Sequence, residues 1–351
     1  MRSALSCAST IGWWSLGEIG SEMSAIKVTV GTEDWPLART FIIARGPQTV
    51  ATVVVVSLVD GEARGHGECE PQEHYGESIE SVLTQIENIR PILEKGISRE
   101  ELLEALPPGA ARNAVDCALW DLEAKRQSTS AWTLAGLSKP EYITTDFTIS
   151  LDTPAAMRSQ ALDYRGWPVM KVKLGGEAED LERMAAVREA LPLTRFTIDA
   201  NESWSYDHLV AMAPAFSEFG VVLIEQPLPA GKDEQLKDYS GLIPVCADES
   251  CHTRDSLPAV LELYDFINIK LDKTGGLTEA LLLANAAREK NLRLMTGCMT
   301  GTSLAMAPAT LVGSLCEFVD LDGGLMLKND RQPAMTCESG RLELPHPELW
   351  G

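Results

Sequence analysis

From Tyr142 onward, short apolar segments alternate with helical ones, and this pattern limits the possible folds more than any other feature of the sequence. Alternation of this kind is typical of a parallel sheet with helical crossovers, and eight such units favour closure into a barrel. Helical stretches such as "AEDLERMAAVREALP" and "LTEALLLANAAREKN" follow most of the candidate strands. The eight candidates are "YITTDFTISL", "PVMKVKL", "RFTIDAN", "VVLIEQP", "IPVCADES", "DFINIKLDK", "LRLMTGCM" and "CEFVDLDGG".

An open, doubly wound sheet is the competing architecture. Such a sheet is expected to carry an early glycine-rich turn that binds a dinucleotide. The nearest candidate, "LGGEAED", lacks the GxGxxG spacing. The barrel is therefore the preferred interpretation.

The part of the chain before Tyr142 has a different pattern. Residues 26–60 indicate two strands, and the second, "TVATVVVVSLVDG", ends at the turn signal Asp60-Gly61. In "PPGAARNAVDCALWDLEAKRQ" the apolar residues recur at the spacing of one helical face. We expect a small α+β unit that extends to about residue 130.

The net charge restricts the class of partner. Lys and Arg number 30 against 51 Asp and Glu, so the field around the protein repels nucleic acid and anionic lipid. No segment is long and apolar enough for a membrane span. Cations or small molecules are therefore the expected partners, with no nucleic acid and no membrane.

The cysteines and the first residues bear on location. Eight cysteines are scattered without metal-ligand spacing, which indicates reduced thiols in the cytoplasm. Residues 1–24 lack the apolar core of a signal peptide and carry Glu18 and Glu22. We expect a disordered extension there, or a start of the protein at Met23.

Acidic residues stand where three successive candidate strands end. Asp199, Glu225 and Asp248 follow the apolar runs of "TIDAN", "LIEQP" and "CADES". Each alone is more simply a loop residue, but the carboxyl ends of barrel strands converge at one face, so the three together can bind one hard cation. Oxygen-only ligation suits Mg²⁺ better than zinc. We predict a Mg²⁺ site, with Asn201 and Glu249 beside the ligands.

Lysines flank this acidic group on both sides. Lys171 and Lys173 alternate onto one face of their strand, and Lys270 ends a strand three positions further round. A neighbouring cation and burial both lower the pKa of a lysine. Lys171 is therefore expected to make Lys173 a usable base. His208 and His252 lie in no ligand pattern and are interpreted as ordinary polar residues.

Together these motifs resemble the muconate-lactonising subgroup of the enolase superfamily. The KxK motif, the three acids, the lysine of strand six and the "GCM" of strand seven carry the likeness, from about residue 26 to about residue 345. The resemblance implies a modified TIM barrel, (β/α)7β, with an N-terminal α+β capping domain. It implies that Lys173 and Lys270 act as acid and base on opposite faces of a carboxylate substrate, through a Mg²⁺-stabilised enediolate.

The implied domains are an extension (1–24), the capping domain (25–130), the barrel (131–325) and a C-terminal segment that packs back on the capping domain (326–351). A homo-oligomer is also implied. The "GCM" motif adds Cys298 and Met299 as substrate-binding residues.

Residues of the eighth candidate strand distinguish between members of the subgroup. Asp320 and Asp322 alternate onto one face toward the barrel mouth, where two carboxylates suit a substrate ammonium and repel a dianion. This DxD resembles that of dipeptide epimerases, where it holds the free amino group of the dipeptide. The simpler interpretation is that both residues cap the turn at Gly323-Gly324.

The loop "WPLARTFIIARG" is similar to the capping loop of L-Ala-D/L-Glu epimerases. Arg45, with Arg39 in reserve, is the candidate partner for a substrate glutamate side chain. His74 and Tyr75 lie in a second loop that either closes over the substrate or forms a simple turn. The expected activity is Mg²⁺-dependent epimerisation of a dipeptide, most plausibly L-Ala-D/L-Glu. The alternatives are an N-acylamino acid racemase or cycloisomerase and, more remotely, a non-catalytic scaffold.

Overall fold

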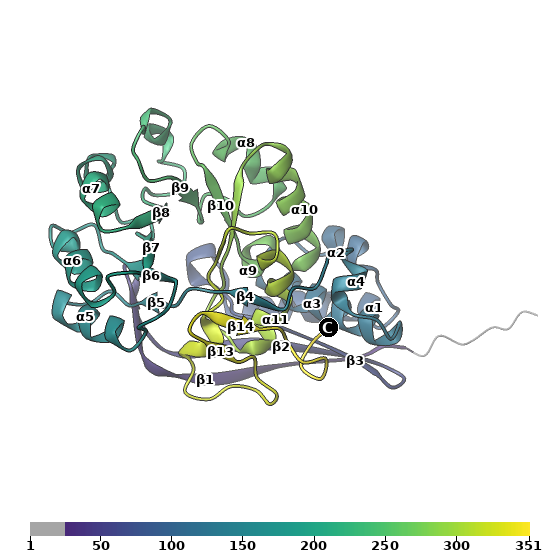
Figure 1. The fold of residues 1–351 in the computed structure, drawn as a ribbon. Coiled ribbons are helices and arrows are strands. Elements are labelled where there is room, and N and C mark those ends of the chain that lie inside the picture. Colours follow the sequence, from purple (N-terminus) through teal and green to yellow (C-terminus); the bar gives the residue numbers. More distant parts are fainter. Residues whose placement is uncertain (1–24) are drawn as a thin grey trace, which may run out of the picture.

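The computed structural model describes residues 25–351, so the expected N-terminal extension lies outside the described residues. The described chain forms an antiparallel sheet with helices, followed by a parallel barrel (Figure 1). This confirms the predicted barrel with an N-terminal α+β capping domain. None of the helices within residues 25–351 has the length and hydropathy needed to cross a bilayer.

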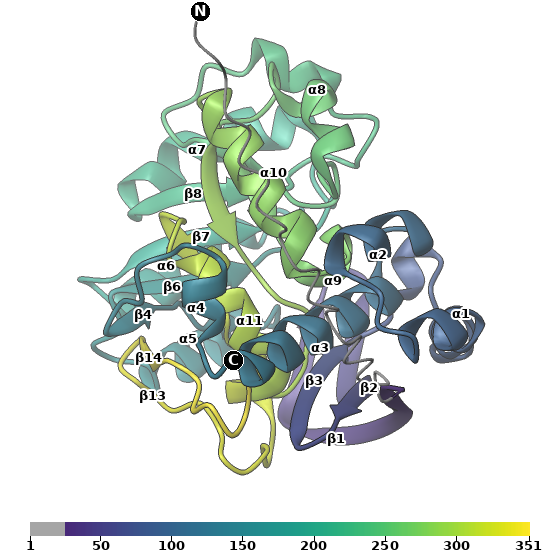
Figure 2. The ribbon, with the colours of Figure 1, turned by 90° about the vertical axis from the view of Figure 1, so that its right-hand side faces the viewer.

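The capping domain contains three antiparallel strands, although the sequence pattern indicated only two. Gly65 and Gly67 weaken the apolar pattern of the third strand, but they are needed there because helix α3 packs directly on it. A Cβ on Gly67 would lie 2.0 Å from the carbonyl oxygen of Ala114. Figure 2 shows the helices stacked on this sheet. The elements are β1 (Lys27–Ile43), β2 (Gly46–Asp60), β3 (Ala63–Cys69), η1 (Glu73–Tyr75), α1 (Ile79–Leu93), α2 (Arg99–Ala105), α3 (Ala110–Arg126) and α4 (Ala131–Leu134).

The barrel sheet has eight parallel strands in sequence order, β5 to β12. The first and last strands meet where the backbone N–H of Asp146 donates to the carbonyl of Val319 at 2.9 Å. The strands are β5 (Thr148–Ile149), β6 (Val169–Lys173), β7 (Arg195–Asp199), β8 (Val221–Glu225), β9 (Val245–Ala247), β10 (Phe266–Ile269), β11 (Arg293–Thr296) and β12 (Phe318–Val319).

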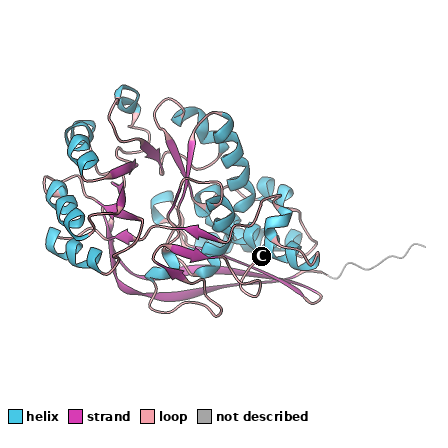
Figure 3. Cartoon of the chain, in the orientation of Figure 1, coloured by secondary structure: helices cyan, strands magenta, loops and turns pink. Residues whose placement is uncertain are grey.

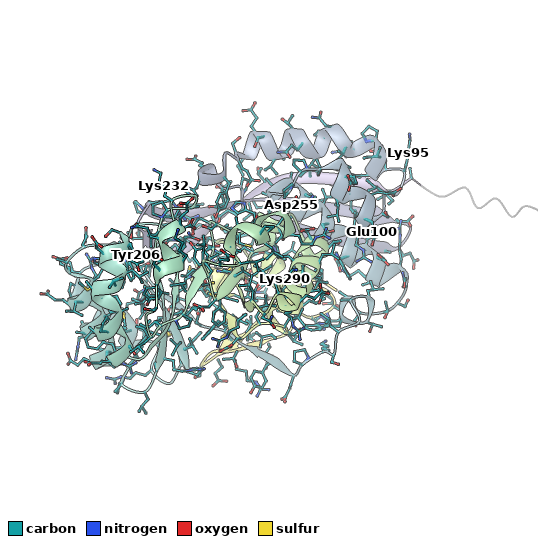
Figure 4. All side chains as sticks on the ribbon, turned by 90° about the horizontal axis from the view of Figure 1, so that it is seen from above. Lys95, Glu100, Tyr206, Lys232, Asp255 and Lys290 are labelled. Atoms are coloured by element: carbon teal, nitrogen blue, oxygen red, sulfur yellow. The ribbon has the colours of Figure 1, made fainter. Side chains whose placement is uncertain are left out.

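Helices cover the outside of the barrel (Figure 3). Leu209 and Phe216 of α7 and Leu283 of α10 are buried in one apolar cluster with barrel-strand residues such as Ile198 and Ile267. The exposed polar residues Lys232, Asp255 and Lys290 lie on the outer surface in Figure 4. The helices are α5 (Pro154–Leu162), α6 (Asp180–Ala190), α7 (Tyr206–Glu218), η2 (Glu234–Asp238), η3 (Arg254–Ser256), α8 (Leu257–Val260), α9 (Leu271–Thr274), α10 (Leu277–Glu289), α11 (Ser303–Gly313) and η4 (Gly323–Met326).

The first predicted barrel strand is split in the structure. Its first half, β4 (Tyr142–Thr144), pairs with β14 (Arg341–Glu343), which pairs in turn with β13 (Cys337–Glu338). Only the second half, β5, joins the barrel. The sequence did not reveal this division, because only residues 145–147 separate the two halves and Ile143, Phe147 and Ile149 continue one alternating apolar pattern.

Several contacts join the capping domain to the rest of the chain, and two of them show its position. The β1–β2 hairpin extends across the barrel mouth, where the N–H of Leu151 donates to the carbonyl of Ile42 at 3.0 Å. On another side, the buried indole of Trp350 donates to the carbonyl of Cys117 in α3 at 3.0 Å. The capping domain is therefore fixed over the carboxyl ends of the barrel strands.

Candidate active site

Three carboxylates lie together at the carboxyl ends of β7, β8 and β9. Asp199, Glu225 and Asp248 each offer one oxygen, and these three atoms lie within 4.8 Å of one another. All three side chains are buried. The arrangement arises because neighbouring parallel strands end at the same edge of the barrel, as the sequence pattern predicted.

The three carboxylates fit a hard divalent cation. Burial, together with the nearby Asp199 carboxylate, raises the pKa of Glu225 to about 7. A bound cation would relieve this repulsion, and the all-oxygen donor set is the one that Mg²⁺ prefers. The Nδ2 of Asn268 donates to Glu225 Oε1 at 2.8 Å, and Lys273 Nζ lies 2.6 Å from Asp248 Oδ1. These two neighbours, which the sequence analysis missed, orient the ligand carboxylates.

Lys171 lies behind this group and contacts several carboxylates at once. Its Nζ is 2.7 Å from Asp320 Oδ2, 2.8 Å from Glu225 Oε2 and 3.1 Å from Asp199 Oδ2. Burial lowers the pKa of Lys171, but these carboxylates outweigh burial and raise it well above its usual range. The local sequence shows the neighbouring lysine and an apolar strand but not these acids, which other strands contribute. Lys171 is therefore held as a cation.

The two lysines predicted to act as acid and base lie on either side of the carboxylates. On β6, Lys173 Nζ donates to Asp199 Oδ2 at 2.6 Å and to Asn201 Oδ1 at 3.0 Å. After β10, Lys270 Nζ donates to Asp248 Oδ2 at 2.7 Å. The ring of Phe41, from the capping hairpin, lies 5.9 Å from Lys173 Nζ. Strands β7 to β9 separate the two lysines, so an atom placed between them would face one on each side.

Asp320 and Asp322 each use one oxygen within the protein. Asp320 Oδ2 accepts from Lys171, whereas its Oδ1 is buried without a hydrogen-bond partner. Asp322 Oδ2 accepts from the backbone N–H of Thr148 at 2.7 Å, and its Oδ1 lies 4.0 Å from the Sγ of Cys298. Burial and the Asp320 carboxylate raise the pKa of Asp322 to about 7. Within residues 25–351, therefore, Asp320 Oδ1 has no donor and Asp322 Oδ1 has only the weak thiol donor of Cys298.

Asp146 lies beside this pair and was missed by the sequence analysis. Its side chain is fully buried at the first barrel strand. Burial and the Asp320 carboxylate raise the pKa of Asp146 well above its usual range. No local pattern signals this contact, because Asp146 and Asp320 are brought together only by closure of the barrel.

Arg45 lies at the mouth of the site among acidic residues. Its Nη1 is 2.8 Å from Glu249 Oε1 and 3.5 Å from Glu202 Oε2, and Glu202 also lies 2.9 Å from His74 Nε2. The reserve candidate, Arg39, pairs instead with Asp163, and its side chain is 61% exposed.

The second capping loop also reaches this region. The rings of Tyr75 and His252 pack edge to face at 4.7 Å. Asn201 and Glu202 adopt left-handed backbone conformations, with φ of 43° and 69°. Strained backbone of this kind clusters at functional sites.

One pocket of about 90 Å³ is lined by Lys173, Lys270, Arg45, Asp320 and Asp322, whereas the buried carboxylate triad is not among its lining residues. The predicted residues Cys298 and Met299 line it. The capping domain contributes one wall of this pocket, of which the sequence pattern indicated only Arg45. The lining residues from the capping domain are Phe41, Ile43, Arg45, Gln48, Glu70 and Gln72.

Both parts of the chain match models of known protein families. Residues 25–136 match the mandelate racemase / muconate lactonizing enzyme N-terminal domain. Residues 155–346 match the enolase C-terminal domain-like model.

Two characterised relatives are similar over nearly their whole length. The chain is 47% identical to L-Ala-D/L-Glu epimerase of Escherichia coli K12, over 90% of this chain and 99% of that protein. It is 44% identical to N-acetyl-D-glutamate racemase of a Pseudoalteromonas species, over 85% of this chain and 95% of that protein.

Solved structures of related proteins are also similar to this chain. One is an enolase family member from Agrobacterium tumefaciens with homology to dipeptide epimerases, solved with bound sodium and L-Ala-L-Glu. It matches this structure with a TM-score of 0.90 at 45% identity, over 93% of this chain and 100% of that chain. A dipeptide epimerase from Enterococcus faecalis V583, with Mg and L-Leu-L-Tyr, has a TM-score of 0.85 at 27% identity, covering 92% and 97%. The chain belongs to the mandelate racemase / muconate lactonizing enzyme family of the enolase superfamily.

Proposed function

We propose that this protein is a Mg²⁺-dependent dipeptide epimerase that inverts the α-carbon of the carboxyl-terminal residue, with L-Ala-D/L-Glu or a related dipeptide as substrate. One observation carries the proposal: a carboxylate triad stands between two lysines, and these lysines line one pocket together with Asp320 and Asp322. The similarity to L-Ala-D/L-Glu epimerase over 90% of this chain supports it.

The protein's own residues would divide the work by position. Asp199, Glu225 and Asp248 would hold Mg²⁺, which when bound would stabilise negative charge on the substrate carboxylate. One lysine, in its neutral form, removes the α-proton from one face of the substrate. The other, as an ammonium, returns a proton to the opposite face. Lys173 and Lys270 exchange these roles in the reverse reaction, because each turnover leaves the base protonated and the acid neutral.

The aspartates of strand eight would select the substrate. Among residues 25–351, Asp320 Oδ1 has no hydrogen-bond donor, and Asp322 Oδ1 accepts only from the weak thiol donor of Cys298, so a substrate ammonium would satisfy both oxygens. Arg45 is the proposed partner for a glutamate side chain. It is held by Glu249 and Glu202, so a substrate carboxylate would share its guanidinium with those residues.

N-acylamino acid racemisation is the second candidate. The relative named N-acetyl-D-glutamate racemase favours it, because that protein shares 44% identity with this chain. An N-acyl substrate has no ammonium, however, and would leave Asp320 Oδ1 and Asp322 Oδ1 without that donor. We therefore rank the dipeptide first.

Several further features are part of the proposal. We keep 25–130, 131–325 and 326–351 as the domain boundaries, with a homo-oligomer in the cytoplasm as the working form. The seven cysteines within residues 25–351 are free thiols, which agrees with a reducing compartment.

The test is a panel of L,L and L,D dipeptides and their N-acetylated counterparts, incubated in D₂O with Mg²⁺. Proton NMR would follow loss of the α-proton signal and appearance of the second epimer. We expect exchange and inversion for free dipeptides. A preference for N-acetyl or N-succinyl amino acids over every free dipeptide would replace the proposal with the racemase.

A further inference from the structure

Two buried glutamates, Glu68 in β3 and Glu70 directly after it, hold the loop that follows β11. Glu68 Oε1 accepts from the backbone N–H of Thr302 at 2.7 Å, and Glu70 Oε2 accepts from that of Thr300 at 2.9 Å. The spacing of two residues between the glutamates matches the spacing of two in the loop, because alternate strand residues point to one face. The capping domain and the barrel are thus joined at two equivalent points.

The two glutamates differ in what else they contact. Glu68 pairs with Arg331 at 2.7 Å and does not line the substrate pocket. Glu70 lines the pocket and binds two side chains that also line it: Gln48 Nε2 donates to its Oε1 at 2.6 Å, and Gln72 Nε2 donates to its Oε2 at 3.0 Å. Glu70 therefore organises pocket residues, whereas Glu68 only attaches the loop.

The side chain of Glu70 is the centre of a hydrogen-bond network. Three N–H donors, from three separate segments, converge on one carboxylate, which offers acceptors only. The hydroxyl of Thr300 also donates to Gln48 Oε1 at 3.1 Å, so two of these segments bind each other. Glu70 is only 8% exposed. A buried polar network of this kind fixes the positions of its members.

We propose that Glu70 is a positioning residue that sets the capping-domain wall of the substrate pocket, by holding Gln48, Gln72 and the backbone of Thr300 in place. This rests on the proposed function, because the wall lies beside Arg45 and would meet the side chain of the epimerised residue. Glu70 makes no contact with the lysines or the carboxylate triad among the hydrogen bonds of residues 25–351. It acts on substrate binding and not on proton transfer.

The test compares Glu70→Leu with Glu68→Leu, a matched control two residues earlier that frees the same loop. Glu70→Leu should raise KM for a dipeptide about tenfold while kcat stays within about threefold, since uniform binding is lost. Glu68→Leu should lower the melting temperature but leave KM and kcat of the folded enzyme unchanged. Glu70→Gln should restore most of the KM, because Gln48 can turn its amide to meet the new side chain.

Hydrogen exchange gives a readout that needs no turnover. Glu70→Leu should speed exchange of the Thr300 amide more than that of Thr302, and Glu68→Leu should do the reverse. If Glu70→Leu does not fold, Gln72→Leu removes one donor and should raise KM by about threefold. Equal KM effects in the two leucine variants, or an unchanged Thr300 amide in Glu70→Leu, would overturn the proposal. Wild-type enzyme inactive on every dipeptide would instead count against the proposed function.

Discussion

The ammonium anchor gives the sharpest test of substrate class, through the substitution Asp322→Asn. The structure holds Asp322 Oδ2 on the N–H of Thr148 and leaves Oδ1 for a ligand. An amide cannot serve both roles. If its oxygen accepts from Thr148, its NH₂ group faces the substrate ammonium, and the opposite orientation turns NH₂ toward the Thr148 N–H.

The size of the effect follows from the buried position of the pair. Asp322 is 3% exposed, so its bond to an ammonium is a charge-assisted hydrogen bond largely shielded from water. Losing one such bond costs on the order of 2 to 3 kcal/mol of transition-state binding. That is about a thirty- to two-hundred-fold loss in kcat/KM. The assay should run at least one pH unit above the pKa of Asp322, which is about 7, so that the wild-type carboxylate is ionised.

The comparison needs two substrates and two enzymes. We measure kcat/KM for L-Ala-L-Glu and for its N-acetyl form, with wild type and Asp322→Asn, by deuterium uptake and polarimetry. Acetylation should harm the wild type strongly and the variant little further, because both changes remove the same interaction. Equal, multiplicative losses from acetylation in both enzymes would refute the anchor, as would normal activity of the variant on the free dipeptide.

Three further predictions concern the metal, the lysines and stability. Asp248→Asn should abolish Mg²⁺ binding by calorimetry and all turnover while circular dichroism stays native; normal activity after chelation would contradict the metal assignment. Alanine at Lys173 or Lys270 should stop net inversion, yet each variant should exchange deuterium into one epimer only, and equal exchange into both would exclude a two-base mechanism. Burial raises the pKa of Asp116 to about 6, so its folded form keeps a proton that the unfolded chain loses at about pH 4. The stability it contributes is present below about pH 4 and falls by about 3 kcal/mol as the pH rises through 6; urea unfolding should show this slope in wild type and not in Asp116→Asn.

The sequence could predict the barrel and the cluster of three carboxylates because both depend on local patterns. Alternating strands and helices indicate crossovers, and the acids that end successive strands must meet at one edge. Asp199, Glu225 and Asp248 were found in this way, and the structure brings them together.

The partners of these residues could not be predicted, because they are separated widely along the chain. Lys171 and Asp320 are 149 residues apart and meet only across the closed barrel. Glu70 and Thr300 are 230 residues apart and meet only because the capping domain docks on the loop after β11. Strand β3 was missed for a related reason: its glycines serve a helix contact that no neighbour in sequence reveals.

The docking of one domain over the other separates two tasks that natural selection can change independently. The groups proposed for chemistry come from barrel strands, whereas Phe41, Arg45 and Gln48 reach the pocket from the capping hairpin. Mutations in that hairpin can therefore alter which side chain is accepted without touching the lysines or the carboxylate triad. Gene duplication followed by drift in residues 41–48 would be a short route from one dipeptide to another. For the same reason, grafting this segment from a relative is a direct strategy for changing specificity in the laboratory.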